Sequence, residues 1–126
     1  MVKKILIAED DPDIRWILKM VLGEAGYQVE AHATGNSILE RKEEWPDLFI
    51  LDRALPMVDG IAICKYLKVK RETKHIPIIM ISSYHELRNK ATAVGVDDFV
   101  DKPFNLKHLL HVVNKHIATR GVESEQ

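Results

Sequence analysis

The sequence predicts an α/β fold: a doubly wound, five-stranded parallel sheet with strand order 2-1-3-4-5 and five helices. Short β-rich runs alternate with helical patterns from end to end, and three of these runs are apolar on both faces. Strands of that kind are typical of parallel sheets that helices cover on both sides. Right-handed crossovers then favour the order 2-1-3-4-5. The strands are expected at Lys4–Ala8, Gln28–His32, Leu48–Leu51, Ile78–Ile81 and Asp98–Val100.

The helices are placed by their end signals and apolar stripes. Asp11 followed by Pro12 is a helix-start signal, and Gly26 ends the stripe that follows. Asn105 is an N-cap candidate for the last helix. The three helices between them are expected at about Ser37–Glu44, Val58–Arg71 and Glu86–Val94.

Length and composition indicate one domain and exclude several functions. A chain of 126 residues fits a single domain, which we expect over residues 1–118. Residues 119–126 are polar and unpatterned, as in a frayed tail or the start of a linker. A net charge of −1 gives no general attraction to nucleic acid or to an anionic membrane. No apolar run approaches the roughly 20 residues that span a bilayer.

The single cysteine, Cys64, cannot form an internal disulfide. The apolar stretch behind Lys3 and Lys4 stops at Glu9, which argues against a signal peptide. We therefore expect a cytoplasmic protein that binds neither membrane nor nucleic acid directly.

Chemically active side chains gather at the ends of four predicted strands. The carboxyl ends of parallel strands open on one edge of the sheet, and ligands bind there in doubly wound folds. Each residue taken alone has an ordinary explanation, such as a helix cap, a solvated acid or a turn serine. Together they bring carboxylates, hydroxyls and an ammonium group to one place: Glu9, Asp10, Asp11, Asp52, Ser82, Ser83 and Lys102.

Converging carboxylates point to a bound cation and to phosphoryl chemistry. They repel one another unless a cation lies between them, and Mg²⁺ suits an open site with few carboxylates. Asp52, directly after an apolar strand, is then placed to act as a nucleophile and form an acyl phosphate. Lys102 and the Ser82 hydroxyl are candidates to bind the phosphoryl oxygens.

Five segments carry a resemblance to a known family. Over about Lys3–Ile117 the sequence resembles the response regulator receiver domain, the CheY-like and flavodoxin-like module of two-component signal transduction. Each segment is moderately specific alone, but all occur in order and at family-like spacing. They are Ile5–Pro12, Pro46–Asp52, Leu55–Gly60, Ile76–Ser82 and Gly95–Phe104.

The resemblance implies a role for each site residue. Asp52 would accept a phosphoryl group from a histidine kinase or a histidine phosphotransfer protein. Mg²⁺ would be bound by Asp10 and Asp52, by Glu9 through water, and by the backbone carbonyl of Ala54. Ser82 and Phe99 would occupy the two switch positions, and the peptide between Lys102 and Pro103 would be cis.

The resemblance also implies how the signal leaves the domain. Phosphorylation would change the surface made by the fourth helix, the fifth strand and the fifth helix, for an unidentified protein target or for a dimer formed on phosphorylation. Such a domain is not an enzyme beyond its own phosphorylation and dephosphorylation. Phe99 lacks the hydroxyl of the more usual Tyr, so we expect its ring to be biased inward even without phosphate.

Three other departures from the family pattern matter. Glu9 replaces the commoner Asp, which lengthens one arm of the acidic pair. Arg53 stands where an apolar residue is more common, and the sequence offers no account of it. Ala54 and Tyr84 occupy positions that gate water access, so the phosphoryl lifetime does not follow from the family.

Three alternatives are weaker. A flavodoxin-like FMN binder needs a loop rich in Gly, Ser or Thr after the first strand, and this loop is acidic instead. A haloacid-dehalogenase-type phosphatase uses a second acid two residues after its nucleophile, where this chain has Ala54. A docking domain that no longer accepts phosphate would not need the complete set of acids, hydroxyl and lysine.

Overall fold

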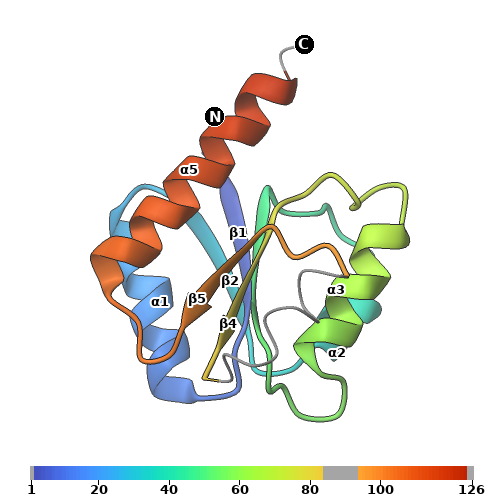
Figure 1. Cartoon of the computed structure of the whole chain (residues 1–126), viewed down its shortest axis with the longest axis horizontal. Coiled ribbons are helices and arrows are strands. Elements are labelled where there is room, and N and C mark those ends of the chain that lie inside the picture. The colour runs from blue at the N-terminus through green and yellow to red at the C-terminus, as the bar shows by residue number, and fades with distance from the viewer. Residues whose placement is uncertain (1, 84–93, 125–126) are drawn as a thin grey trace.

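The computed structural model describes residues 2–83 and 94–124, with side chains described as far as residue 118. Its centre is one five-stranded parallel sheet with the order β2-β1-β3-β4-β5, which confirms the predicted topology (Figure 1). The strands are β1 (Lys4–Ala8), β2 (Gln28–His32), β3 (Leu48–Asp52), β4 (Ile78–Ser82) and β5 (Asp98–Asp101).

Helices cover both faces of the sheet, as a parallel sheet requires. Helices α1 and α5 lie on one face and α2 and α3 on the other (Figure 1). The expected helix at about Glu86–Val94 lies outside the described residues. The described helices are α1 (Pro12–Glu24), α2 (Asn36–Leu39), α3 (Gly60–Val69) and α5 (Leu106–Ser124).

The sheet divides the hydrophobic core into two clusters because side chains alternate along each strand. In β3, Leu48 and Ile50 pack toward α1 and α5, whereas Phe49 and Leu51 pack toward α2 and α3. Every residue of β3 and β4 is buried. The three runs that are apolar on both faces therefore form the three inner strands, β1, β3 and β4, of this two-sided core.

The start and end of α1 follow the sequence signals. The Asp11 carboxylate accepts hydrogen bonds from the backbone N–H groups of Asp13 (2.9 Å) and Ile14 (3.2 Å), and Pro12 occupies the first turn. Gly26, just beyond the helix, has φ +101°, a conformation that favours glycine. The cap fixes the direction in which the chain leaves the acidic loop after β1.

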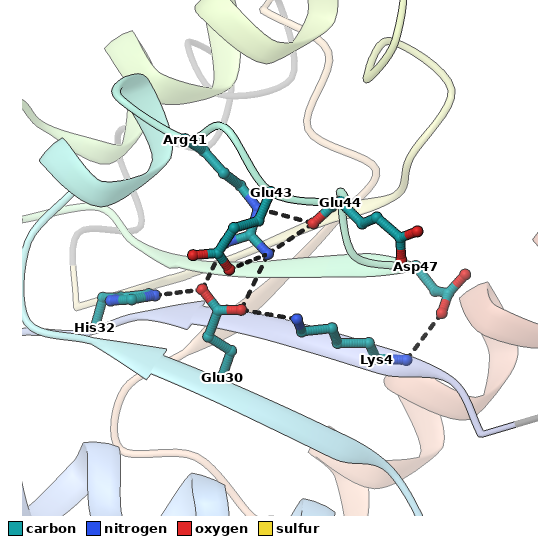
Figure 2. Close-up of polar contacts among 7 residues, drawn as sticks. All are labelled: Lys4, Glu30, His32, Arg41, Glu43, Glu44 and Asp47. Atoms are coloured by element: carbon teal, nitrogen blue, oxygen red, sulfur yellow. Dashed lines mark hydrogen bonds and ion pairs between the residues drawn. The ribbon is translucent and has the colours of Figure 1, made fainter.

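Helix α2 is shorter than expected. We predicted a helix over about Ser37–Glu44, and the prediction is wrong beyond Leu39, where the helix ends. The cause is a polar cluster, which we define as Lys4, Glu30, His32, Arg41, Glu43, Glu44 and Asp47 (Figure 2).

The polar cluster is centred on an ion pair between Arg41 and Glu30. Arg41, whose side chain is 3% exposed, donates to both Glu30 carboxylate oxygens (2.5 and 3.0 Å) and to the carbonyl oxygen of Glu44 (2.7 and 2.9 Å). Lys4 Nζ and His32 Nε2 lie 2.9 and 2.6 Å from the same carboxylate. These charge-assisted contacts hold the segment after Leu39 in a non-helical path.

Helix α5 continues through Ser124, past residue 118, where we expected the patterned part of the chain to end. The division of the chain at residue 118 stays a prediction. Among the described residues, no helix combines the length and the apolar character that a membrane span needs.

Candidate functional site

Three carboxylates meet at the carboxyl edge of the sheet. Glu9 follows β1 directly and Asp52 ends β3, and these two strands are neighbours in the sheet. Carboxylate oxygens of Glu9, Asp10 and Asp52 all lie within 4.8 Å of one another. Glu9 is fully buried and Asp52 is 3% exposed, whereas Asp10 is exposed. Three of the four predicted acids therefore form one compact group with an open side, whereas the fourth, Asp11, uses its carboxylate to cap α1.

Lys102 joins the two buried acids. Its ammonium nitrogen lies 2.8 Å from Glu9 Oε1 and donates a hydrogen bond to Asp52 Oδ2 at 3.0 Å. Its backbone N–H donates to the carbonyl oxygen of Ser82 (2.9 Å), which fixes the start of the loop after β5. The peptide from Lys102 to Pro103 is cis, as the resemblance implies.

The charged groups at this edge change one another's pKa values. Burial raises the pKa of Glu9 above its ordinary value, and the neighbouring Asp52 adds to this effect. Burial opposes ionisation of Asp52 too, but hydrogen bonds from Glu9 and Lys102 outweigh it and lower the pKa of Asp52. Burial likewise works against the charged form of Lys102, but the two carboxylates raise its pKa. Of the two buried acids, Asp52 is therefore the one whose ionised form its surroundings favour.

The two switch candidates lie on neighbouring strands. Ser82 is buried at the end of β4, and its backbone pairs with Asp101 of β5. Phe99 of β5 is partly buried and packs against the cluster on the side of α2 and α3. The structure therefore brings Ser82 to the edge that carries Asp52 and places Phe99 further back along β5.

Two arginines that the sequence analysis did not assign to the site support its loops. Arg15 donates from Nη1 to the backbone carbonyl oxygens of Glu9 (2.8 Å) and Asp10 (3.3 Å), so it supports the acidic loop from α1. Its position one turn after the helix cap is the signal that could have indicated this contact. Arg53 Nη1 lies 3.6 Å from Asp59 Oδ2, which gives Arg53 a partner in the loop after β3.

A hollow beside Lys102 opens next to the site. It has a volume of about 530 Å³ and is mostly apolar. Helix α1 lines it with Ile14 and Ile17, the loop after β5 with Phe104, and the start of α5 with Leu106. An apolar surface of this kind, bordering a charged group, is suited to contact with another molecule.

Comparison with known proteins places this fold and acidic edge in one class, the receiver domains of two-component signalling. A sequence profile of the response regulator receiver domain matches residues 5–114, and the chain belongs to that family. It is therefore a receiver domain of the kind found in phosphorylation-dependent two-component switches.

Individual relatives agree with the family assignment. The phosphate regulon transcriptional regulatory protein PhoB of Escherichia coli K12 is 35% identical over 98% of the chain. The chain spans 56% of the length of that relative. A putative response regulator from Chloroflexus aurantiacus has a TM-score of 0.89 at 30% identity, covering 94% of this chain and 99% of that one. The receiver domain of a histidine kinase from Syntrophus aciditrophicus has a TM-score of 0.86 at 32% identity, covering 94% and 92%.

Proposed function

We propose that Asp52 is the phosphoacceptor of this domain and that Mg²⁺ bound among Glu9, Asp10 and Asp52 supports the transfer. The observation that carries the proposal is that Asp52, two other acids and Lys102 lie together. These four residues come from three different segments of the chain. An acceptor needs an ionised carboxylate, and the lowered pKa of Asp52 supplies one.

The residues fit a divalent cation. Three carboxylates face one ammonium group, so the cluster carries more acidic than basic groups. Oxygen ligands and an exposed side at Asp10 match the preference of Mg²⁺ for few carboxylates and several waters. When bound, Mg²⁺ would neutralise charge on the acids and on the phosphoryl oxygens. We propose the carbonyl of Ala54 as a further ligand, as the family resemblance implies.

Both oxygens of Asp52 are held for the reaction. Oδ1 accepts a hydrogen bond from the Ala54 N–H (3.1 Å), and Oδ2 accepts one from Lys102 (3.0 Å). One oxygen attacks the phosphorus of a phosphohistidine, the phosphorus–nitrogen bond breaks, and the leaving imidazole keeps the electron pair and takes a proton. Lys102 and the Ser82 hydroxyl then bind phosphoryl oxygens, so catalysis consists of positioning and charge neutralisation.

We propose a histidine kinase or a histidine phosphotransfer protein as the donor. The apolar hollow supports docking of the donor there, because Lys102, which lines it, is hydrogen-bonded to Asp52. Ser82 and Phe99 would carry the change toward β5 and α5, for a downstream protein target or a second copy of the chain. In this proposal the domain catalyses only its own phosphorylation and dephosphorylation. Its cytoplasmic location and its lack of direct nucleic-acid binding stay predictions.

Chemical labelling tests the acceptor. Incubated with acetyl phosphate and Mg²⁺, the chain should gain one phosphoryl group that alkali or hydroxylamine removes, as measured by mass spectrometry of the intact protein. Asp52→Asn should gain none. Asp11→Asn is the matched control, because it removes a nearby exposed acid while Asn still caps α1, and it should label like the wild type. The same labile group on Asp52→Asn would contradict the assignment.

A further inference from the structure

The loop from Arg53 to Asp59 connects the acceptor strand β3 to helix α3 and carries Ala54. It begins directly after Asp52, and the Ala54 N–H is bonded to Asp52 Oδ1. A backbone hydrogen bond from Gly60 N–H to the Arg53 carbonyl oxygen (3.0 Å) closes its base. The position of the Ala54 backbone relative to Asp52 therefore depends on how firmly this loop is held.

The middle of the loop is strained. Met57 has φ +69°, and Val58 N–H donates to the Pro56 carbonyl oxygen (2.8 Å), which together make a γ-turn of the rare kind. The Met57 side chain is 82% exposed, so its burial cannot offset the strain. Such backbone conformations persist only where the surrounding structure determines them. The contacts at the two ends of the loop consequently matter more than they would in a relaxed loop.

An ion pair between Arg53 and Asp59 joins those two ends. The Asp59 carboxylate lies 3.6 Å from Arg53 Nη1 through Oδ2, while its Oδ1 accepts the Ala62 N–H (2.8 Å) and caps α3. The Arg53 side chain is 19% exposed, and its buried Nε has no hydrogen-bond acceptor among the described residues. Within that part of the chain, Asp59 is the charged partner of a mostly buried guanidinium group.

We propose that Arg53 is a positioning residue for the metal site: its ion pair with Asp59 fixes the backbone that carries the Ala54 carbonyl beside Asp52. This inference rests on the proposed Mg²⁺ site. A second mechanism makes the opposite prediction. If Arg53 acted only through its positive charge, it would repel a cation, and its removal would tighten Mg²⁺ binding. The sign of the effect therefore separates positioning from simple repulsion.

The experiment is a double-mutant cycle on Mg²⁺ affinity. The unphosphorylated full chain is titrated with Mg²⁺ and followed by amide NMR shifts, for the wild type, Arg53→Met, Asp59→Asn and the double variant. Asn at position 59 keeps the helix cap and removes the charge. Positioning predicts that each single variant binds Mg²⁺ about two- to fivefold more weakly, the range of an ion pair worth up to ~1 kcal/mol. The double variant should bind no more weakly than the weaker single variant.

Two further variants make the outcome decisive. Arg53→Lys keeps a cation and should restore most of the affinity. Lys70→Met is the control: it removes a different cationic side chain, one that lies 3.5 Å from the carboxylate of Glu72, and should leave the affinity unchanged. The Ala54 amide signal should broaden or shift in metal-free Arg53→Met while thermal unfolding stays cooperative.

Failure of the inference and failure of the proposed function give different results. If Arg53→Met binds Mg²⁺ as tightly as the wild type or more tightly, the positioning role is overturned and the metal site stays intact. Simple repulsion would also show in the double variant, where the gain from Arg53→Met would cancel the loss from Asp59→Asn. Absence of Mg²⁺ binding to the wild type would overturn the proposed site itself, and the role of Arg53 with it.

Discussion

At the scale of single residues, Gly60 shows how closely helix α3 approaches the acceptor. A Cβ atom at this position would lie 2.4 Å from the carbonyl oxygen of Asp52 and 3.1 Å from Arg53 Cα. Both neighbours are backbone atoms, which cannot rotate away as a side chain could. The first residue of α3 therefore packs directly on the chain that carries the acceptor carboxylate.

We expect Gly60→Ala to destabilise the domain. Accommodating the methyl group requires a shift of α3 or β3, and overpacking of this kind costs about 1–3 kcal/mol. Chemical denaturation measures the change in the free energy of unfolding. Gly23→Ala is the control, since a Cβ there meets nothing within 4 Å and alanine favours the helix. If Gly60→Ala and Gly23→Ala are equally stable, α3 can shift to make room for the methyl group without a loss of stability.

The meeting of Glu9, Asp10, Asp52 and Lys102 could be predicted from the sequence, because parallel strand ends meet at one edge whatever the details of packing. The sequence did not predict the contacts of Arg15 and Arg53. Arg53 and Asp59 are six residues apart in a loop, and the turn at Met57 and the backbone hydrogen bond from Gly60 to Arg53 fold that loop back on itself. Long side chains that reach backbone carbonyls, as Arg15 does, leave no periodic pattern in the sequence.

At the scale of elements, the polar cluster takes the place of the missing second half of α2. The sequence after Leu39 allows a helix by local propensity, and Pro46 marks a plausible end. The end of α2 is decided by a contact between residues 11 apart in the sequence: Arg41 donates a hydrogen bond to Glu30 of β2 instead of facing solvent. Propensity is a weak predictor wherever tertiary contacts of this strength compete with it.

We expect Glu30→Gln to destabilise the domain in a pH-dependent way. The hydrogen bonds from Arg41 lower the pKa of Glu30 below its ordinary value near 4.5, although partial burial opposes the shift. A carboxyl group with a lowered folded-state pKa contributes stability above its unfolded pKa and loses it as the pH falls. The variant should therefore be about 2 kcal/mol less stable at pH 7, with the difference shrinking steadily below pH about 4.5.

Denaturation of both proteins at a series of pH values tests this expectation. Glu24→Gln, which changes an exposed acid at the end of α1, is the control and should show a much smaller difference. A Glu30→Gln deficit that is as large at pH 3 as at pH 7 would mean that the loss comes from packing rather than from the ion pairs.

At the scale of the whole molecule, the strand order of the sheet could be predicted because only a few arrangements of the strands satisfy the general rules of parallel sheets. Strands apolar on both faces require helices on both sides, and right-handed crossovers then restrict the strand order. The extent of α5 could not be predicted in the same way. Residues 119–124 have no apolar stripe, yet they continue the hydrogen-bonded helix, which needs no core contact to extend by a turn or two.

Cation binding should stabilise the whole domain. A ligand that binds only the folded chain raises its stability by mass action, by about 2.7 kcal/mol when its concentration is a hundred times the Kd. We therefore expect added Mg²⁺ to raise the thermal unfolding temperature of the wild type. Asp10→Asn should reduce that gain, whereas Asp13→Asn, a change to an exposed acid in the first turn of α1, should preserve it. An undiminished gain in Asp10→Asn would exclude Asp10 as a ligand.

The surroundings of Trp45 have a consequence for spectroscopy. Trp45 lies just before β3, edge-to-face with Phe49 at a centroid distance of 6.2 Å and beneath the Arg41 guanidinium at 5.9 Å. The other tryptophan of the chain, Trp16 in the first half of α1, is 63% exposed. Fluorescence of the folded chain thus combines a shielded emitter at the amino edge of the sheet with a water-exposed one on α1. Iodide in solution should therefore quench Trp16 more strongly than the partly buried Trp45, so the unlabelled chain carries one optical probe on α1 and another before β3.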